Sequence, residues 1–99
     1  EGVFIGGRAK RLFCYDPADG RLKWSFAARG DLDSSPVVCG GRVVFGSDDG
    51  RLYIVDAATG RLAWSYEVGK PLTAAPAVAD GWVVIGSEDG RVYAFGPPP

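Results

Sequence analysis

The sequence repeats itself at a spacing of forty residues. Trp24 returns as Trp64 and Pro36 as Pro76, and the run Arg21-Leu22-Lys23-Trp24-Ser25 returns at 61–65 with one change. A regular period of this length is typical of repeat architectures, in which each unit buries its apolar face against its neighbours. The 99 residues are therefore about two and a half copies of one unit rather than one irregular domain.

One complete repeat, residues 35–69, reads as four short strands. The runs 36–39, 42–46, 51–55 and 61–66 are rich in Val, Ile, Phe, Tyr and Trp, and Gly, Asp or Pro bounds each of them. Such runs predict strands joined by hairpins. The last run alternates, with Leu62, Trp64 and Tyr66 on one face, whereas the two central runs are apolar on both faces. A sheet apolar on both faces is covered on both sides.

These features predict an all-β fold of β-propeller blades, four-stranded antiparallel sheets stacked face to face around an axis. Residues 1–28 are expected to form a partial first blade, 35–68 a complete second blade and 75–96 a partial third blade. A proline tail follows at 97–99. The ring is incomplete unless the chain is oligomeric or part of a longer chain.

Composition sets limits on the function. The net charge is −1, which predicts no nucleic-acid partner, and no apolar run reaches the roughly 18 residues of a membrane span. The chain has no histidine, the commonest transition-metal ligand and general base. The acidic turns lack the alternating oxygen ligands of a calcium loop, so hairpin formation is the favoured interpretation and no metal is expected.

The two cysteines occupy different positions of the repeat. Cys14 corresponds to Ile54 and Ala94, and Cys39 corresponds to Ala79. Because the equivalent residues are apolar, two small buried thiols are favoured over a disulfide.

The run Asp-x-x-x-Gly-Arg-Leu-x-Trp, found at 16–24 and again at 56–64, resembles the tryptophan-docking motif of the quinoprotein-type, or PQQ-like, β-propeller repeats. The resemblance implies that each Trp packs on the Gly-containing turn of an adjacent blade. The structural docking residues are then Asp16, Gly20, Trp24, Asp56, Gly60 and Trp64. The third copy departs from the motif, because Gly96 stands where Asp is expected. Trp82 lies outside the motif, and a contact at the blade edge is favoured over a contact with a partner.

The resemblance implies three kinds of function. The favoured one is a non-catalytic segment that acts as a protein-binding scaffold, like the outer-membrane-assembly propellers. A ligand-sensing domain of a larger signalling protein and a fragment of a quinone-dependent dehydrogenase stay open. No catalytic residue and no cofactor are expected, because no cofactor- or calcium-binding residue of the enzymes matches a position here. The same resemblance favours a periplasmic or exported location.

Two loops are candidates for partner binding. The first repeat carries Arg8, Lys10 and Arg11 in the hairpin where the other repeats carry Asp48-Asp49 and Glu88-Asp89. The connector at 29–35 is polar and contains Asp31 and Asp33. Loops carry function on such scaffolds, although drift in a solvated hairpin is the favoured explanation of the charge reversal.

The chain contains no methionine and begins inside a repeat, so a processed chain or a piece of a longer one is expected. Its end blades are predicted to expose apolar faces, which drive association. The expected partner is therefore the chain itself, most simply as a two-chain ring of six blades, or the remaining blades of a longer chain.

Overall fold

The computed structural model describes residues 2–6, 10–32, 35–72, 76–79, 82–87 and 90–96. These residues form ten strands and no helix, as expected for an all-β fold. The strands are β1 (Val3–Gly6), β2 (Arg11–Tyr15), β3 (Leu22–Ala27), β4 (Val37–Cys39), β5 (Arg42–Gly46), β6 (Arg51–Asp56), β7 (Leu62–Glu67), β8 (Ala77–Ala79), β9 (Trp82–Gly86) and β10 (Val92–Phe95).

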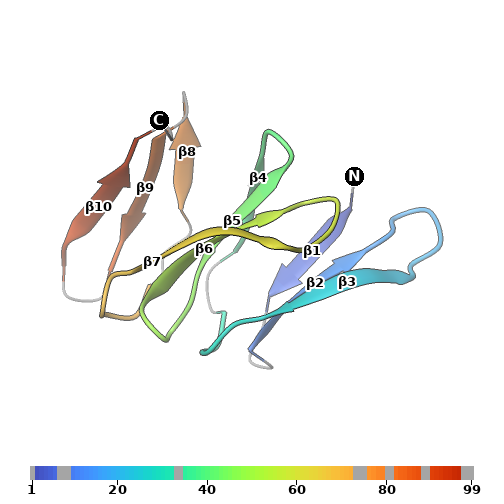
Figure 1. The fold of residues 1–99 in the computed structure, drawn as a ribbon, viewed down its shortest axis with the longest axis horizontal. Coiled ribbons are helices and arrows are strands. Elements are labelled where there is room, and N and C mark those ends of the chain that lie inside the picture. Colours follow the sequence, from blue (N-terminus) through green and yellow to red (C-terminus); the bar gives the residue numbers. More distant parts are fainter. Residues whose placement is uncertain are drawn as a thin grey trace.

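The strands form three antiparallel sheets in chain order (Figure 1). The first sheet is β1-β2-β3, the middle sheet is β4-β5-β6-β7, and the third is β8-β9-β10. Equivalent strands pair in equivalent register, since Phe4 lies opposite Cys14 in the first sheet and Val44 opposite Ile54 in the middle one. The three sheets are propeller blades, and the described residues do not close a ring.

The turn before the last strand of a blade is built by its aspartate. The Asp56 carboxylate accepts hydrogen bonds from the backbone N–H groups of Ala58 and Thr59, at 2.8 and 3.1 Å. The Gly60 N–H donates to the Asp56 carbonyl at 2.8 Å, and Gly60 has a φ of 76°. Side-chain capping by Asp and a left-handed Gly are the two elements such a turn needs.

The middle sheet is buried on both faces, because a sheet lies on each side of it. Toward the first sheet, a cluster forms around Phe45 and Tyr53, and its buried members are Leu12, Leu32, Val43, Phe45, Tyr53 and Val55. Toward the third sheet, a second cluster contains Val44, Leu52, Leu72, Val83 and Ile85. Successive residues of β5 thus point into opposite clusters, as the strand period of two requires.

The connectors between blades also contribute to the core. Leu32 and Leu72 are buried and lie against Gly6 and Gly46, the last residues of β1 and β5. A Cβ on Gly46 would lie 2.6 Å from the Leu72 Cβ. The glycine that recurs at this repeat position leaves room for the leucine of the following connector.

The prediction for the cysteines is right for one and wrong for the other. Cys14 is buried, and burial raises the pKa of its thiol, whereas Cys39 is exposed at the end of β4; both are free. The equivalent of Cys39 is Ala79, so this repeat position carries a small residue. Small residues occur both in cores and at exposed strand ends.

The part of the chain that the structure describes contains no helix long and apolar enough to cross a membrane.

Candidate functional site

Trp24 of β3 joins the first blade to a turn of the second. Its indole Nε1–H donates a hydrogen bond to the Ala57 carbonyl at 3.0 Å. The ring covers Gly60, because a Cβ placed there would lie 2.5 Å from the Trp24 Cδ2 and Cε3 atoms. Phe4 also packs against the indole, with ring centroids 5.8 Å apart. A large aromatic ring with one polar handle is suited to this position.

Trp64, the repeat equivalent of Trp24, lies in different surroundings. Its side chain is 39% exposed, and its ring contacts Tyr66 and Phe95 at centroid distances of 6.0 and 5.3 Å. The equivalent of Ala57 is Pro97, which lies outside the described residues. Docking of Trp64 on an adjacent turn therefore stays a prediction.

The turns of the docking motif are nearly identical in the first two repeats. The Ala18 N–H donates to the Asp16 carboxylate at 2.8 Å, as Ala58 does to Asp56, and Gly20 has a φ of 74°. They differ in what covers the glycine. A Cβ on Gly20 would have nothing within 4 Å, whereas Gly60 lies beneath Trp24.

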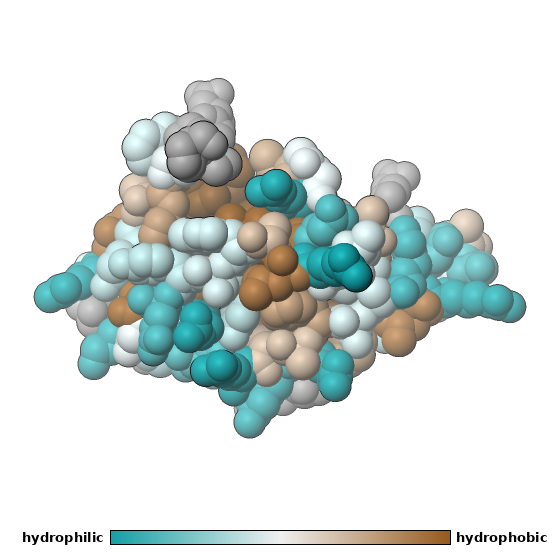
Figure 2. All heavy atoms as spheres, viewed as in Figure 1, coloured by the Kyte–Doolittle hydropathy of each residue, from teal (hydrophilic) through white to brown (hydrophobic). Residues whose placement is uncertain are grey.

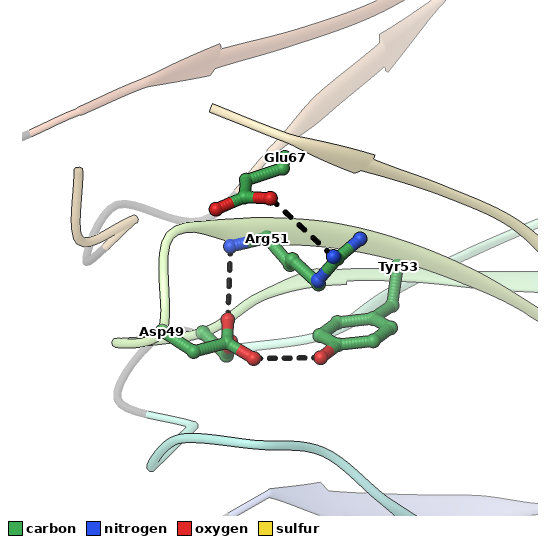
Figure 3. A network of polar contacts seen from close by, with 5 residues as sticks. Asp49, Arg51, Tyr53 and Glu67 are labelled. Atoms are coloured by element: carbon green, nitrogen blue, oxygen red, sulfur yellow. Dashed lines mark hydrogen bonds and ion pairs between the residues drawn. The ribbon is translucent and has the colours of Figure 1, made fainter. Parts of the chain in front are cut away.

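The main polar cluster lies on the opposite side of the middle blade, at the hairpin between β5 and β6 (Figure 3). Asp49 accepts hydrogen bonds from the Ser47 hydroxyl, from the Tyr53 hydroxyl at 2.7 Å and from the Arg51 N–H at 2.9 Å. Arg51 also forms an ion pair with Glu67 on β7 at 3.4 Å. The hairpin is thereby fixed to the next two strands.

Burial and hydrogen bonding act in opposite directions on the Asp49 carboxyl. Burial raises its pKa, but the bonds from Ser47, Tyr53, Arg51 and the Arg29 backbone together hold that pKa below its ordinary value. Burial, followed by the bond to Asp49, raises the pKa of Tyr53. At neutral pH the pair is therefore a carboxylate and a protonated phenol that satisfy each other.

The hairpin also joins the two connectors of the middle blade. The Asp48 N–H donates to the Asp31 carbonyl at 2.9 Å, and the Leu72 N–H donates to the Ser47 carbonyl at 3.1 Å. Gly30 has no room for a side chain, because a Cβ there would lie 2.5 Å from the Asp49 nitrogen. One hairpin thus holds the segments that enter and leave its blade.

Of the candidate partner-binding residues, the structure describes Lys10, Arg11 and Asp31, while Arg8 and Asp33 lie outside the described residues. Lys10 is exposed with a φ of 61°, the left-handed conformation that Gly50 and Gly90 adopt in the other repeats. The exposed Arg11 side chain donates to the Ser25 hydroxyl at 3.3 Å.

Asp31 is half-buried, and its Oδ1 atom is buried without a hydrogen-bond partner in the described part of the chain. Among the described residues, no hydrogen bond or ion pair joins this carboxylate to Lys10 or Arg11 of the first hairpin. Within the same described ranges, no three His, Cys, Asp or Glu residues are grouped as a metal site requires.

Sequence reasoning did not identify the Asp49–Tyr53 pair, although the repeats contain a signal for it. Asp and Tyr occur together at 49 and 53 and again at 89 and 93, whereas the first repeat has Ala9 and Phe13. The carboxylate and the hydroxyl that binds it are thus present together or absent together. That pattern indicates that the two residues act together as a pair.

Three face-packed antiparallel blades with an aromatic ring on a glycine turn define a PQQ-like β-propeller. A family model described as the outer membrane protein assembly factor BamB matches residues 1–97, and the chain belongs to that family. No curated protein matches this chain. The family therefore confirms the class that the docking motif predicts.

Solved structures give the same fold. BamB from Moraxella catarrhalis is 24% identical with a TM-score of 0.84, and the match covers 95% of this chain and 30% of that one. The computationally designed Ika4 protein is 22% identical with a TM-score of 0.87, over 98% of this chain and 61% of that one.

An enzyme is also among the matches. The quinohemoprotein alcohol dehydrogenase ADHIIG from Pseudomonas putida HK5 is 29% identical with a TM-score of 0.85, over 94% of this chain and 17% of that one. In each comparison the chain spans less than two thirds of the matched protein. The neighbours include both assembly factors and dehydrogenases, so the fold alone does not decide between them.

Proposed function

We propose that this chain is a non-catalytic β-propeller segment that binds other proteins as a scaffold. The observation that carries the proposal is the family match over residues 1–97, whose description is that of an assembly factor. The same resemblance supports an extracytoplasmic location.

The chemistry of the polar cluster supports a structural role for its groups. A general acid or base needs a pKa near the working pH and a free position beside its substrate. The pKa of Asp49 is lowered and that of Tyr53 is raised, which moves both away from neutrality, and the two groups bind each other. We therefore assign neither residue a catalytic role.

A dehydrogenase fragment is the second candidate, because a quinohemoprotein alcohol dehydrogenase is 29% identical over most of this chain. The half-buried Asp49 carboxylate of the middle hairpin already accepts hydrogen bonds from its own blade. This chain alone is thus expected to retain no quinone in equilibrium dialysis, and retention would favour the enzyme reading.

We propose the basic hairpin of the first repeat as the partner-binding loop; the alternative, favoured from the sequence, is that its charge reversal is drift in a solvated hairpin. The test is a charge exchange that gives this hairpin the residues of its siblings, Arg8→Asp with Lys10→Gly. Proteins of an envelope extract that cross-link to the wild-type chain should be lost from the double variant. The matched control is Arg21→Asp, an exposed charge reversal in the docking turn on the opposite side of the blades. Equal recovery with all three proteins would contradict binding at this hairpin.

A further inference from the structure

The first repeat places three cations where the start of β2 meets the end of β3. Arg11 begins β2 and lies opposite Ala27, the last residue of β3. The Ala28 N–H donates to the Lys10 carbonyl at 2.8 Å, and Arg29 follows in the connector. Lys10, Arg11 and Arg29 are all exposed, and we call them the basic corner. The start of β2 and the end of β3 lie toward the lower edge of Figure 1, and Figure 2 shows hydrophilic side chains along that edge.

The second repeat provides a carboxylate of its own at the equivalent place. Arg51, the equivalent of Arg11, forms an ion pair with Glu67 at 3.4 Å. The equivalent of Glu67 is Ala27, so the first repeat keeps the arginine and lacks the acid. The Arg11 side chain donates instead to the Ser25 hydroxyl, at 3.3 Å.

The other two cations of the corner are additions of the first repeat. Lys10 and Arg29 stand where the second repeat has Gly50 and Gly69. Lys10 has a φ of 61°, so a lysine occupies a left-handed position that glycine would fill without strain. Ion pairs among the described residues involve none of the three cations. A chain whose net charge is −1 thus carries a local excess of positive charge at this corner.

The exposure of the corner does not depend on which blades lie beside the first sheet. The middle sheet has a packed sheet on each face, yet the side chains of its Arg51–Glu67 pair are 26% and 63% exposed. The three atoms nearest to a Cβ on Gly50 all belong to the connector that follows β7. The equivalent connector, after β3, is already beside Lys10, and Lys10 is exposed. The equivalent surface of a fully packed blade is therefore open to solvent.

We propose that the basic corner binds a segment of the protein partner that is rich in glutamate or aspartate. The inference rests on the proposed scaffold function and adds the chemistry of the partner. The chain makes the expected contact in its own second repeat, where a glutamate lies beside the equivalent arginine. A partner carboxylate beside Arg11 takes the place that Ala27 leaves open. Further carboxylates of the same segment pair with Lys10 and Arg29, and each contact is a charge-assisted hydrogen bond.

The first experiment measures binding by fluorescence anisotropy, with the 99-residue chain and a labelled synthetic peptide in which glutamate alternates with serine. The control peptide has glutamine in place of every glutamate. The glutamate peptide should bind at least about tenfold more tightly at low salt. The difference should shrink at about 0.15 M salt, because salt screens exposed charges.

The decisive variant gives the first repeat the acid of the second. Ala27→Glu should form an internal ion pair with Arg11, as the equivalent residues do in the second repeat, and should weaken peptide binding at least about tenfold. The matched control is Ala63→Glu, which changes the net charge equally at an exposed position of β7. Its equivalent is Lys23, so the position accepts a charged side chain, and the control should weaken binding less than about twofold. Both variants should keep the wild-type circular dichroism.

Equal affinity for the two peptides, or equal weakening by the two variants, would overturn the inference. Vesicles rich in phosphatidylglycerol that bind the wild-type chain but not Ala27→Glu, with no binding of either peptide, would overturn it in favour of a lipid surface. If peptide binding fails while the Arg8→Asp, Lys10→Gly variant still loses its cross-linked proteins, the scaffold function stands with a partner of other chemistry. Peptide binding that Ala27→Glu abolishes, without any cross-linked envelope protein, would support the acidic ligand and contradict the scaffold function.

Discussion

The first and second repeats carry the same docking motif and nearly the same turns, yet their tryptophans differ. Trp24 donates a hydrogen bond to the next blade and covers its glycine, whereas Trp64 is 39% exposed beside Tyr66 and Phe95. Their hairpins differ as well, since the second contains the Asp49–Tyr53 pair and the first has a lysine in a left-handed conformation. The contribution of a repeat residue to folding stability therefore depends on the residues of the neighbouring blade that it contacts.

The largest expected effect on stability distinguishes Gly60 from Gly20, two glycines with the same backbone conformation. Gly60→Ala should lower the free energy of unfolding by about 4 kcal/mol, because the new Cβ displaces the Trp24 ring in addition to the left-handed strain. Gly20→Ala should cost only the strain, about 1 kcal/mol. Urea unfolding at concentrations below self-association measures both, and equal losses would mean that Trp24 does not pack on Gly60.

The two tryptophans provide the next comparison. Trp24→Ala should cost about 3 kcal/mol, because buried ring area and the hydrogen bond to Ala57 are both lost. The cost is somewhat less than for a fully buried ring, since the indole is half-buried. Trp64→Ala should cost about 1 kcal/mol, since 39% of this residue is exposed to solvent. If denaturant midpoints of the two variants coincided, Trp64 would have a docking surface equivalent to that of Trp24.

Asp49→Asn is expected to cost about 2 kcal/mol at neutral pH, because the amide cannot accept all the hydrogen bonds of the carboxylate. The folded pKa of Asp49 lies below its ordinary value, so its contribution is complete above about pH 4 and is lost as the pH falls through the folded pKa. The stability of the wild-type chain should therefore fall more steeply in acid than that of the variant. Asp19→Asn, at an exposed turn, is the control and should change stability by less than about 0.5 kcal/mol.

The smallest effect concerns the hairpin of the first repeat. Lys10→Gly should raise the free energy of unfolding by about 1 kcal/mol, because glycine adopts a φ of 61° without strain. The reverse change, Gly50→Lys, should destabilise by more than that, since its Cβ would also lie 3.0 Å from the Lys70 nitrogen. A neutral or destabilising Lys10→Gly would show that the left-handed lysine is not strained.

The strand pattern and the turns could be predicted from the sequence because they depend on local chemistry repeated at a fixed period. The expected runs 42–46 and 51–55 correspond closely to β5 and β6. The environment of Trp64 could not be predicted, because it depends on the neighbouring blade rather than on the motif. The exposure of Cys39 was missed because its small equivalent, Ala79, does not distinguish a core from a strand end. The Asp49 cluster is visible in sequence only when it is compared with Ala9 and Phe13.

The position of the middle sheet, with a packed sheet on each of its faces, has a consequence for the dynamics of the chain. Backbone amides exchange with solvent when their own sheet opens, and the free energy of that opening grows with the contacts that must be broken. Opening of β1–β3 or of β8–β10 breaks one interface, whereas opening of β5 and β6 breaks two. The amides of Val44 and Val55 should therefore be the last to take up deuterium. Their exchange is expected to require unfolding of the whole chain.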